Sequence, residues 1–402
     1  MDSPLPLALD DYKRYGRQMV LDNFGLSAQL KLQRASVVVV GAGGIGCPAL
    51  QYLAAAGVGR IGIIDHDTVE VSNLQRQILH NEETVGMYKT ESAAKAILRN
   101  NSRIKVDIMT EAISPSNVSG LLKDYDVVLD CTDNAPSRYL LSDACVQLGK
   151  PLVSGGAERY GGQVCIYNFG EDGPCLRCRY PDPPPPAGGC QQTGVLGVVT
   201  GIIGNIQALQ AIKVITGLHE HEPTLIYFTS LGFPLFQNYK LDPKVPGCPA
   251  CGKEGERIGK IRDIDYEQWC GVAPDWVETG IVEGTSGNRI RVQDFKQILD
   301  GHSPDQLNVI DVRPTIEFNI CHLPNTINVP LDDVVANPGK YLPKNDAVKT
   351  YVLCRLGNDS MTAAGALRDF YRKSGANNMT IKDVIGGLRA WTRKVDSGFP
   401  EY

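Results

Sequence analysis

The sequence lacks an excess of positive charge. Its 402 residues include 40 Lys and Arg against 45 Asp and Glu, which gives a net charge of −5. A surface that binds nucleic acid along the whole chain needs a basic excess, so this class of protein is disfavoured. The length is enough for two or three domains of about 100–200 residues each.

The sequence also lacks a long uninterrupted hydrophobic run. Its most apolar stretch, residues 195–215, is broken by four polar residues, so it predicts a buried helix and not a membrane span. The first ten residues contain neither a cationic region nor an apolar core, so we expect no secretory signal and a cytoplasmic location. The interrupting residues are Asn205, Gln207, Gln210 and Lys213.

Histidine is scarce, and none of the six histidines has the spacing of metal ligands. Cysteine is plentiful by comparison, with twelve residues. Without a secretory signal, these cysteines point to reduced thiols, metal binding or catalysis and not to disulfides.

A buried strand, a glycine-rich turn and a helix follow one another early in the chain. The β-branched run of residues 36–40 predicts the strand, and residues 47–56 predict the helix. Gly41, Gly43 and Gly46 form the pattern G-x-G-x-x-G, which binds nucleotide phosphates in this setting. The helix N-terminus also offers free N–H groups to phosphate. We therefore predict a nucleotide site; the alternative is a glycine-rich turn that binds nothing.

Each glycine has a separate role in this prediction. Gly41 allows the tight turn, Gly43 lets the backbone approach phosphate, and Gly46 lets helix and strand pack closely. A second strand, residues 61–64, ends at Asp65. This position is near the distance of about 20 residues expected for an acid that bonds a ribose hydroxyl. The glycines alone do not identify the nucleotide.

Polar residues follow the strands of the predicted parallel sheet, where the ligand crevice of such a sheet lies. Arg76 and Lys89 can hold a polyphosphate, Arg through its planar fork and Lys as a point charge. Asp133 ends the strand predicted over residues 126–133 and is a candidate Mg²⁺ ligand, since Mg²⁺ favours carboxylate and phosphate oxygens. Asp133 is also a candidate N-cap of the helix that begins near Ala135, and the two roles are compatible.

Two C-x-x-C knuckles stand far apart in the sequence. Cys175 and Cys178 form the first, and Cys248 and Cys251 form the second. Four thiolates make a closed tetrahedral site for structural zinc, although the gap exceeds the roughly 15–20 residues of a compact ribbon. The knuckles must therefore meet across an intervening segment. A redox dithiol is the alternative.

Another cysteine, Cys190, ends a loop rich in Pro and Gly just before the helix predicted over residues 198–216. A thiol near a helix start can have a lowered pKa and act as a nucleophile, although an incidental loop thiol fits equally well. Near the N-terminus, Arg14 and Arg17 fall on one face of a predicted helix. The ordinary interpretation of such arginines is a solvated face.

The chain changes character at residues 253–287, which are charged and weakly periodic and are predicted to be a linker. In the domain that follows, a strand of residues 350–353, a loop starting at Cys354 and a helix of residues 361–372 succeed one another. The loop amides and the helix dipole then favour a thiolate or persulfide at Cys354. A cysteine phosphatase is disfavoured, because Ser360 stands where it would need an arginine.

The first part of the chain resembles the adenylating domain shared by ubiquitin-activating enzymes and their bacterial molybdopterin and thiamine relatives. The glycine turn of residues 41–46, the arginine motif of residues 14–18, the knuckles and the segment that starts at Cys190 all match. The resemblance implies that the nucleotide is ATP with Mg²⁺. The implied ATP-binding residues are Gly41, Gly43, Gly44, Gly46, Asp65, Asn73, Arg76, Gln77, Lys89 and Asp133.

The second part resembles a rhodanese domain, through residues 311–313, the loop of residues 354–360 and residues 386–391. We therefore expect an α/β chain: a Rossmann-like adenylating domain with one structural Zn²⁺ per subunit, followed by a small α/β rhodanese domain. The predicted boundaries are residues 1–252 for the adenylyltransferase domain, 253–287 for the linker and 288–402 for the rhodanese sulfurtransferase domain.

Both domains in this order are similar to eukaryotic enzymes that combine adenylyltransferase and sulfurtransferase in one chain. The resemblance implies that the C-terminal glycine of a ubiquitin-related modifier, of the molybdopterin synthase small subunit, or of both is adenylated and then converted to a thiocarboxylate. These partners are β-grasp proteins that end in Gly-Gly. The product would serve tRNA wobble-uridine 2-thiolation, molybdenum cofactor biosynthesis or both, with protein urmylation as a further use.

The resemblance also implies residue roles and partners. Cys354 carries the persulfide, and Cys190 is the activating cysteine. Arg17 reaches the ATP of the partner subunit in a homodimer, and Asp133 places Mg²⁺. The sulfur donor is expected to be a cysteine desulfurase or another sulfurtransferase, with no direct nucleic acid or membrane partner. The alternative function is an activating enzyme mainly for conjugation of the modifier to protein lysines.

Overall fold

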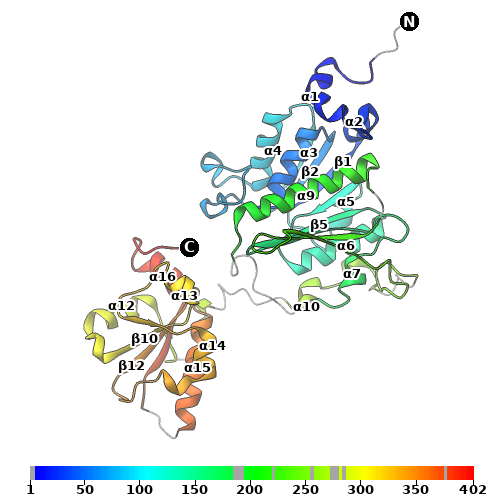
Figure 1. The fold of residues 1–402 in the computed structure, drawn as a ribbon. Coiled ribbons are helices and arrows are strands. Elements are labelled where there is room, and N and C mark those ends of the chain that lie inside the picture. The colour runs from blue at the N-terminus through cyan, green and yellow to red at the C-terminus, as the bar shows by residue number, and fades with distance from the viewer. Residues whose placement is uncertain are drawn as a thin grey trace. The chain divides into compact units, whose positions relative to one another are not determined.

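The chain divides into two compact units, Met1–Val272 and Ala273–Tyr402. Figure 1 shows a sheet with helices on both faces in each unit, which confirms the predicted α/β class. The computed structural model describes residues 5–183, 194–219, 222–253, 258–271, 280–282, 287–374 and 378–402.

The sheet of the first unit has eight strands in the order β3-β2-β1-β4-β5-β6-β7-β8. β1 lies between β2 and β4 and is parallel to both, with Val37 opposite Ile61 on one side and Val127 on the other. From β5 to β8 the neighbours are antiparallel. The strand order reverses beside β1, and ligands bind at such a switch point. The strands are β1 Ser36–Val40, β2 Arg60–Ile64, β3 Lys105–Met109, β4 Val127–Asp130, β5 Leu152–Glu158, β6 Gly161–Tyr167, β7 Thr224–Thr229 and β8 Phe236–Lys240.

Successive residues of β1 contribute to two hydrophobic cores, one on each face of the sheet. Val37 and Val39 belong to the core that contains α3, α4 and α9, and Val38 and Val40 belong to the core that contains α5, α6 and α10. This burial on both faces explains the continuous β-branched run of the strand. The helices are α1 Leu9–Met19, α2 Gly25–Arg34, α3 Gly46–Ala56, α4 Lys89–Asn100, α5 Val118–Leu122, α6 Ala135–Leu148, α7 Leu176–Arg179, α9 Gly197–Thr216 and α10 Tyr266–Cys270, with the 3₁₀ turns η1 Val71–Asn73, η2 Glu82–Thr84 and η4 Ile261–Asp263.

The helix α9 alone among the described helices has the length and apolar composition of a membrane span. It packs against α3 and the sheet, with Val199 and Ile203 fully buried, and Figure 1 shows it in green lying across the sheet. A Cβ at Gly204 would lie 2.1 Å from the carbonyl oxygen of Ile45, so the two helices approach very closely. This packing makes α9 a core helix, as the sequence predicted.

The second unit contains five parallel strands in the order β11-β10-β12-β13-β9. Two further cores cover its faces, one with α14 and α15 and the other with α12 and α16. The strands are β9 Arg289–Ile290, β10 Leu307–Asp311, β11 Thr326–Asn328, β12 Lys349–Leu353 and β13 Ile381–Val384; the helices are α12 Val292–Gly301, α13 Thr315–Phe318, α14 Leu331–Ala336, α15 Asp359–Lys373 and α16 Gly387–Lys394, with η5 Pro304–Gln306 and η6 Pro338–Lys340.

Part of the segment predicted as a linker packs onto the first unit. The turn η4 and the helix α10 place Ile261 and Tyr266 in the core that contains α6. The Tyr266 hydroxyl donates to Asp143 Oδ2 at 2.7 Å, and the same carboxylate accepts from Arg177 Nη2 at 2.8 Å. Sequence reasoning did not place these elements because each is too short to show a helical period.

Loss of the Arg177 side chain should destabilise the first unit. In Arg177→Met the fully buried Asp143 carboxylate loses its ionic partner, and such a loss costs about 3–5 kcal/mol. Hydrogen exchange of the α6 peptide at increasing urea concentrations would measure the free energy of unfolding of this unit. Arg179→Met, a matched change at an exposed position of α7, should alter it by less than about 0.5 kcal/mol. Equal effects of the two substitutions would contradict the prediction.

Candidate functional site

The predicted glycine turn joins β1 to α3. Gly41 has a φ of +97°, and a Cβ there would lie 2.7 Å from the carbonyl oxygen of Cys131. A Cβ at Gly46 would lie 1.9 Å from the carbonyl oxygen of Gly41. Among the described residues, a Cβ at Gly43 would have only the Gln77 Nε2 atom within 4 Å, at 3.8 Å. Gly41 and Gly46 therefore cannot carry a side chain, and Gly43 leaves the backbone accessible to a ligand.

The carboxylate of Asp65, directly after β2, is tied to this turn. Its Oδ2 accepts from the Ala42 amide at 2.8 Å, and its Oδ1 accepts from the Asp67 amide at 2.9 Å. A carboxylate has about four lone-pair positions, so Asp65 can accept further hydrogen bonds. On the same turn, His80 Nε2 lies 2.9 Å from the Ala42 carbonyl oxygen and Nδ1 lies 2.9 Å from Ser92 Oγ. Burial lowers the pKa of His80, which favours a neutral, structural ring.

A cleft of about 360 Å³ opens where β1, β2 and β4 end. Nine of the ten residues predicted to bind the nucleotide line it, and the tenth, Gly46, is buried in the turn. The structure therefore brings residues from three separate βα loops to one place. The nine are Gly41, Gly43, Gly44, Asp65, Asn73, Arg76, Gln77, Lys89 and Asp133.

Two predicted cations and a buried amide are among the side chains that line this cleft. Lys89 is buried and pairs with Asp67 Oδ2 at 2.7 Å, an acid that the sequence reasoning missed although it stands close after Asp65. Arg76 is half-buried and donates to the Ser72 carbonyl oxygen at 3.2 Å. Gln77 Oε1 is buried and has no hydrogen-bond partner within the described residues. Such an oxygen is costly unless a ligand donates to it.

The sequence offered Asp133 both as a Mg²⁺ ligand and as the N-cap of α6, and the structure gives the capping role to the next residue. Asn134 is the N-cap of α6, since its Oδ1 accepts from the Ser137 amide at 2.9 Å. The capping role predicted for Asp133 is therefore wrong. Asp and Asn suit this position equally well, so the sequence did not distinguish them. The Asp133 side chain is exposed at the cleft.

Sequence reasoning also missed Arg138 in the first turn of α6. Its Nη2 donates to the carbonyl oxygens of Thr132 at 3.0 Å and Gly155 at 3.1 Å, so the guanidinium is fixed in the wall of the cleft. Its only sequence signal is its place at the start of the helix that follows Asp133.

The arginines of α1 do not line the cleft. Arg14 donates to the carbonyl oxygen of Asn100 at 3.0 Å. Arg17 is exposed and has no hydrogen bond or ion pair to the described residues. A role for Arg17 at a nucleotide site therefore requires a second copy of the chain.

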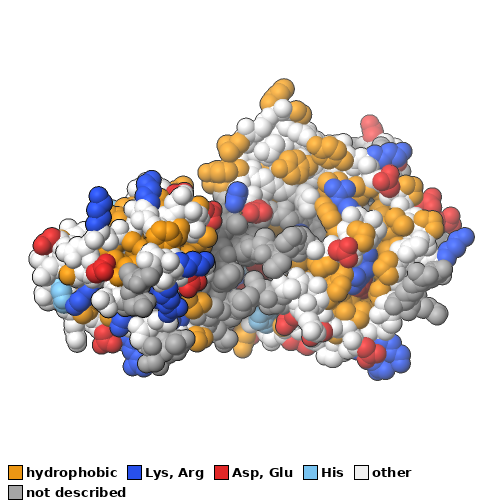
Figure 2. Space-filling model, turned by 90° about the horizontal axis from the view of Figure 1, so that it is seen from below, with side chains coloured by type: hydrophobic (Ala, Val, Ile, Leu, Met, Phe, Trp, Pro, Cys, Tyr) orange, Lys and Arg blue, Asp and Glu red, His pale blue; other side chains and the backbone are white. Residues whose placement is uncertain are grey.

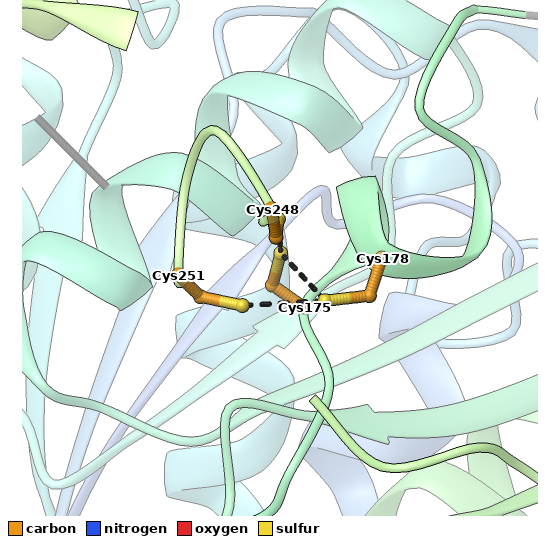
Figure 3. Close-up of side chains that lie close together, drawn as sticks. All are labelled: Cys175, Cys178, Cys248 and Cys251. Atoms are coloured by element: carbon orange, nitrogen blue, oxygen red, sulfur yellow. Dashed lines mark hydrogen bonds between the residues drawn. The ribbon is translucent and has the colours of Figure 1, made fainter. Parts of the chain in front are cut away.

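The two cysteine knuckles meet, as predicted, and Figure 3 shows their sulfur atoms gathered together. Cys175 Sγ lies 3.5 Å from Cys248 Sγ, and Cys178 Sγ lies 3.3 Å from Cys251 Sγ. Four sulfurs bound tetrahedrally to zinc at about 2.3 Å would lie about 3.8 Å apart. The cluster can therefore hold a metal ion such as zinc.

Cys178 is the member of the cluster whose surroundings favour a thiolate. Hydrogen bonds within the cluster lower the pKa of Cys178, whereas the pKa of Cys175 and of Cys251 is raised. The Val245 amide also donates to the Cys178 sulfur at 3.4 Å, which favours the thiolate form that binds metals. Cys190, by contrast, lies outside the described residues, and its role stays a prediction.

The second candidate site is the loop between β12 and α15. Cys354 is fully buried, and its Sγ accepts from the Gly357 amide at 2.9 Å and lies 3.3 Å from Ser360 Oγ. Burial raises the pKa of the Cys354 thiol, whereas hydrogen bonds from Ser360 and Gly357 lower it. The loop amide and the hydroxyl therefore face the sulfur as predicted, whereas burial acts against the thiolate.

A buried ion pair braces the Cys354 loop. Arg289 Nη2 donates to the Gly357 carbonyl oxygen at 2.6 Å, and its Nε donates to Asp383 Oδ2 at 2.8 Å. A Cβ at Gly387, where φ is +57°, would lie 2.3 Å from the Cys354 carbonyl oxygen. The backbone at Gly387 therefore packs directly against the Cys354 loop and leaves no room for a side chain at position 387.

Comparison with known families matches both units. The ThiF family matches residues 15–250, and the rhodanese-like domain matches residues 291–394. Adenylyltransferase and sulfurtransferase MOCS3 of Drosophila yakuba is 46% identical over 405 residues, which cover 98% of this chain and 86% of that protein. The protein of the same name from Bos taurus is 42% identical over 422 residues, which cover 100% of this chain and 90% of that protein.

Solved structures of E. coli MccB share the fold of the first unit. MccB with ATP is 25% identical with a TM-score of 0.50. MccB with AMPCPP and selenomethionine-labelled MccA is 25% identical with a TM-score of 0.51. Each match covers 60% of this chain and 74% of the MccB chain.

The cysteine cluster should bind one metal ion per chain. Native mass spectrometry of the purified chain should show this ion, and Cys251→Ser should lose most of it because one of four ligands is removed. Cys321→Ser, outside the cluster, should keep the ion. Full metal occupancy in Cys251→Ser would contradict the assignment.

Alkylation of Cys354 should depend on pH in the direction set by burial. Because the pKa of this thiol lies above its ordinary value of 9.0, its thiolate fraction is small at pH 8 and rises with pH until above pH 9. The rate of iodoacetamide labelling, measured on the Cys354 peptide by mass spectrometry, should follow this rise. Ser360→Ala removes a hydrogen bond that lowers the pKa and should slow labelling at pH 8. A rate that levels off below pH 8 would contradict the prediction.

Proposed function

The chain belongs to the ThiF family and joins a ThiF domain to a rhodanese-like domain, and from this premise we propose its substrate and the order of its reactions. The chain is an adenylyltransferase and a sulfurtransferase. We propose that it adenylates the C-terminal glycine of a small ubiquitin-related protein and then exchanges one oxygen of that carboxyl group for sulfur. The proposal rests mainly on the cleft, which gathers nine predicted ATP-binding residues.

We propose that ATP occupies this cleft with its phosphates over the glycine turn. Asp65 would accept from a ribose hydroxyl, and Gln77 Oε1 would accept from another donor of the nucleotide. Lys89 would exchange Asp67 for a phosphate oxygen, and Arg76 would bind a second one. The MccB structure with ATP supports this placement, because that protein shares the fold and is 25% identical.

In the proposed adenylation, the glycine carboxylate attacks the α-phosphorus of ATP. The bond to the β-phosphate breaks, pyrophosphate leaves, and an acyl-adenylate forms. Arg76 and Lys89 would stabilise the charge that builds on the leaving phosphates. Asp133 is the proposed Mg²⁺ ligand, and Mg²⁺ when bound offsets phosphate charge. Arg17 of a second subunit would complete the site in a homodimer, since Arg17 is exposed and outside its own cleft.

A small β-grasp partner fits the surface around β8. Large hydrophobic side chains are exposed on this strand and on the turn before it, and such patches mark protein interaction sites. β8 is also an edge strand, which can pair with a strand of another protein. The exposed residues are Leu231, Phe233, Leu235, Phe236 and Tyr239.

The proposed sulfur transfer starts from a persulfide on Cys354. Its terminal sulfur attacks the carbonyl carbon of the adenylate, AMP leaves with the electrons of the broken C–O bond, and an acyl disulfide forms. The Cys190 thiolate then attacks the Cys354 sulfur, which releases the thiocarboxylate and leaves a disulfide between the two cysteines. An external thiol reduces this disulfide. A thioester on Cys190 that the persulfide attacks is the alternative order.

The partner protein, the sulfur donor and the identity of the metal are also part of the proposal. The partner is a ubiquitin-related modifier, the molybdopterin synthase small subunit or both, and its thiocarboxylate serves wobble-uridine thiolation of tRNA, molybdenum cofactor biosynthesis or both in the cytoplasm. A cysteine desulfurase or another sulfurtransferase supplies the sulfur, and zinc occupies the cysteine cluster. Figure 2 shows Lys and Arg interspersed with Asp and Glu on the visible face.

The test is the intact mass of a modifier ending in Gly-Gly after incubation with this protein, Mg-ATP and thiosulfate. The mass should increase by the difference between sulfur and oxygen. Cys354→Ala should abolish this increase and keep pyrophosphate release, and Cys190→Ala should keep AMP-adduct formation but impair thiocarboxylate release. Cys321→Ser is the matched control and should behave as the unchanged chain.

Two outcomes would contradict the proposal. Pyrophosphate release without any mass increase would leave the adenylation standing and refute the sulfur transfer. Transfer of the modifier to lysines of other proteins, independent of Cys354, would instead favour an activating enzyme for conjugation.

A further inference from the structure

The segment of residues 399–402, here called the cover segment, lies against arginines beside the Cys354 loop. The Glu401 carboxylate accepts from Arg389 Nε at 3.2 Å and from Arg393 Nη2 at 2.8 Å. The Arg355 guanidinium carbon lies 4.9 Å from the centre of the Tyr402 ring, and Arg355 also donates to the main-chain oxygen of Tyr402. Glu401 and Tyr402 together therefore contact three arginines.

These arginines are fixed to the loop that carries the reactive sulfur. Arg355 directly follows Cys354 in the chain. At the start of α16, the Leu388 amide donates to the Cys354 carbonyl oxygen at 2.9 Å, and the Arg389 amide donates to the Arg355 carbonyl oxygen at 3.0 Å. Arg393 follows one turn later on the same face of α16. The three cations therefore form a rim attached to the Cys354 loop.

Polar contacts seat the cover segment on this rim. The Tyr402 hydroxyl donates to Glu317 Oε2 at 3.0 Å and accepts from Arg313. The pairs of Glu401 are partly exposed: 37% of the Glu401 side chain, 35% of Arg389 and 55% of Arg393 remain accessible. Exposed ion pairs of this kind are weak, so a dissolved anion can compete with the Glu401 carboxylate.

We propose that the Glu401 carboxylate, by holding Arg389 and Arg393, competes with anionic sulfur donors of the thiosulfate type for the cations beside the Cys354 loop. Guanidinium forks bind planar pairs of oxyanion oxygens well, and a thiosulfate carries such oxygens on its sulfonate group. The cover segment thus limits access of small anions to the sulfur carrier. This inference rests on the proposed function of Cys354.

The chemistry at this site balances without a further reactant. The Cys354 thiolate attacks the terminal sulfur of thiosulfate, and a new sulfur–sulfur bond forms. The original sulfur–sulfur bond of thiosulfate breaks, and sulfite leaves with its electron pair. Cys354 retains the transferred sulfur as a persulfide, and the rim arginines hold the sulfonate oxygens as the leaving group departs.

Steady-state transfer of sulfur from thiosulfate to cyanide by the full chain tests the proposal. Glu401→Gln removes the competing carboxylate and should lower the KM for thiosulfate by about two- to five-fold with kcat unchanged. The effect should shrink as salt is added, because the competing charges are exposed. Asp369→Asn is the matched control: it removes the same charge from an exposed pair with Arg372 on α15 and should leave KM unchanged.

A second substitution tests whether the lower KM for thiosulfate depends on the rim arginines. Arg389→Gln in the Glu401→Gln background should cancel the gain, because a cation that binds the donor is lost. An unchanged or raised KM in Glu401→Gln, or an equal fall in Asp369→Asn, would overturn the inference. Turnover that survives Cys354→Ala would instead refute the proposed function, so the two failures are distinguishable.

Discussion

The carboxyl ends of parallel strands lie at one edge of a sheet, and both candidate sites depend on this constraint. In the first unit, the ends of β1, β2 and β4 gather residues from Gly41 to Asp133 around one cleft. In the second unit, β12 lies between β10 and β13 in parallel, and the loop that follows it starts at Cys354. In an antiparallel sheet neighbouring strands run in opposite directions, so the same loops would be divided between two edges.

Each unit fixes the loop at this edge of its sheet with a buried charged group that binds backbone. In the first unit Asp65 accepts from the Ala42 amide, which holds the glycine turn. In the second unit Arg289 binds the Gly357 carbonyl oxygen, while the amide of Gly357 donates to Cys354 Sγ. The charged groups therefore help to set the shape of each loop. Nearby backbone carbonyl groups leave no room for a side chain at Gly41, Gly46 and Gly387.

The sequence predicted the elements that a local pattern of residues specifies, whereas contacts between separate elements could not be predicted from it. The β-branched strand β1, the helix α3 and the long helix α9 lie within one residue of their predicted bounds, because hydrophobic period and glycines mark them. The knuckles were paired from chemistry alone, since two thiolates do not complete a tetrahedral site. By contrast, the pair of Lys89 with Asp67, the place of Arg138 and the contacts of Glu401 depend on how separate elements and loops pack together. No single-sequence pattern records such contacts.

A sulfurtransferase has to keep its other thiols from reacting, and burial raises the pKa of several of them. Desolvation raises the pKa of Cys47 and of Cys165 to about 12, and it raises the pKa of Cys131 and Cys145 as well. Because the thiolate is the nucleophile, these core cysteines do not compete for sulfur near neutral pH. Burial also raises the pKa of Cys354, but its sulfur faces loop amides and a hydroxyl that can stabilise an added charge. A raised pKa therefore does not separate Cys354 from the core cysteines; its place at the carboxyl end of β12, where the Gly357 amide donates to its sulfur, does.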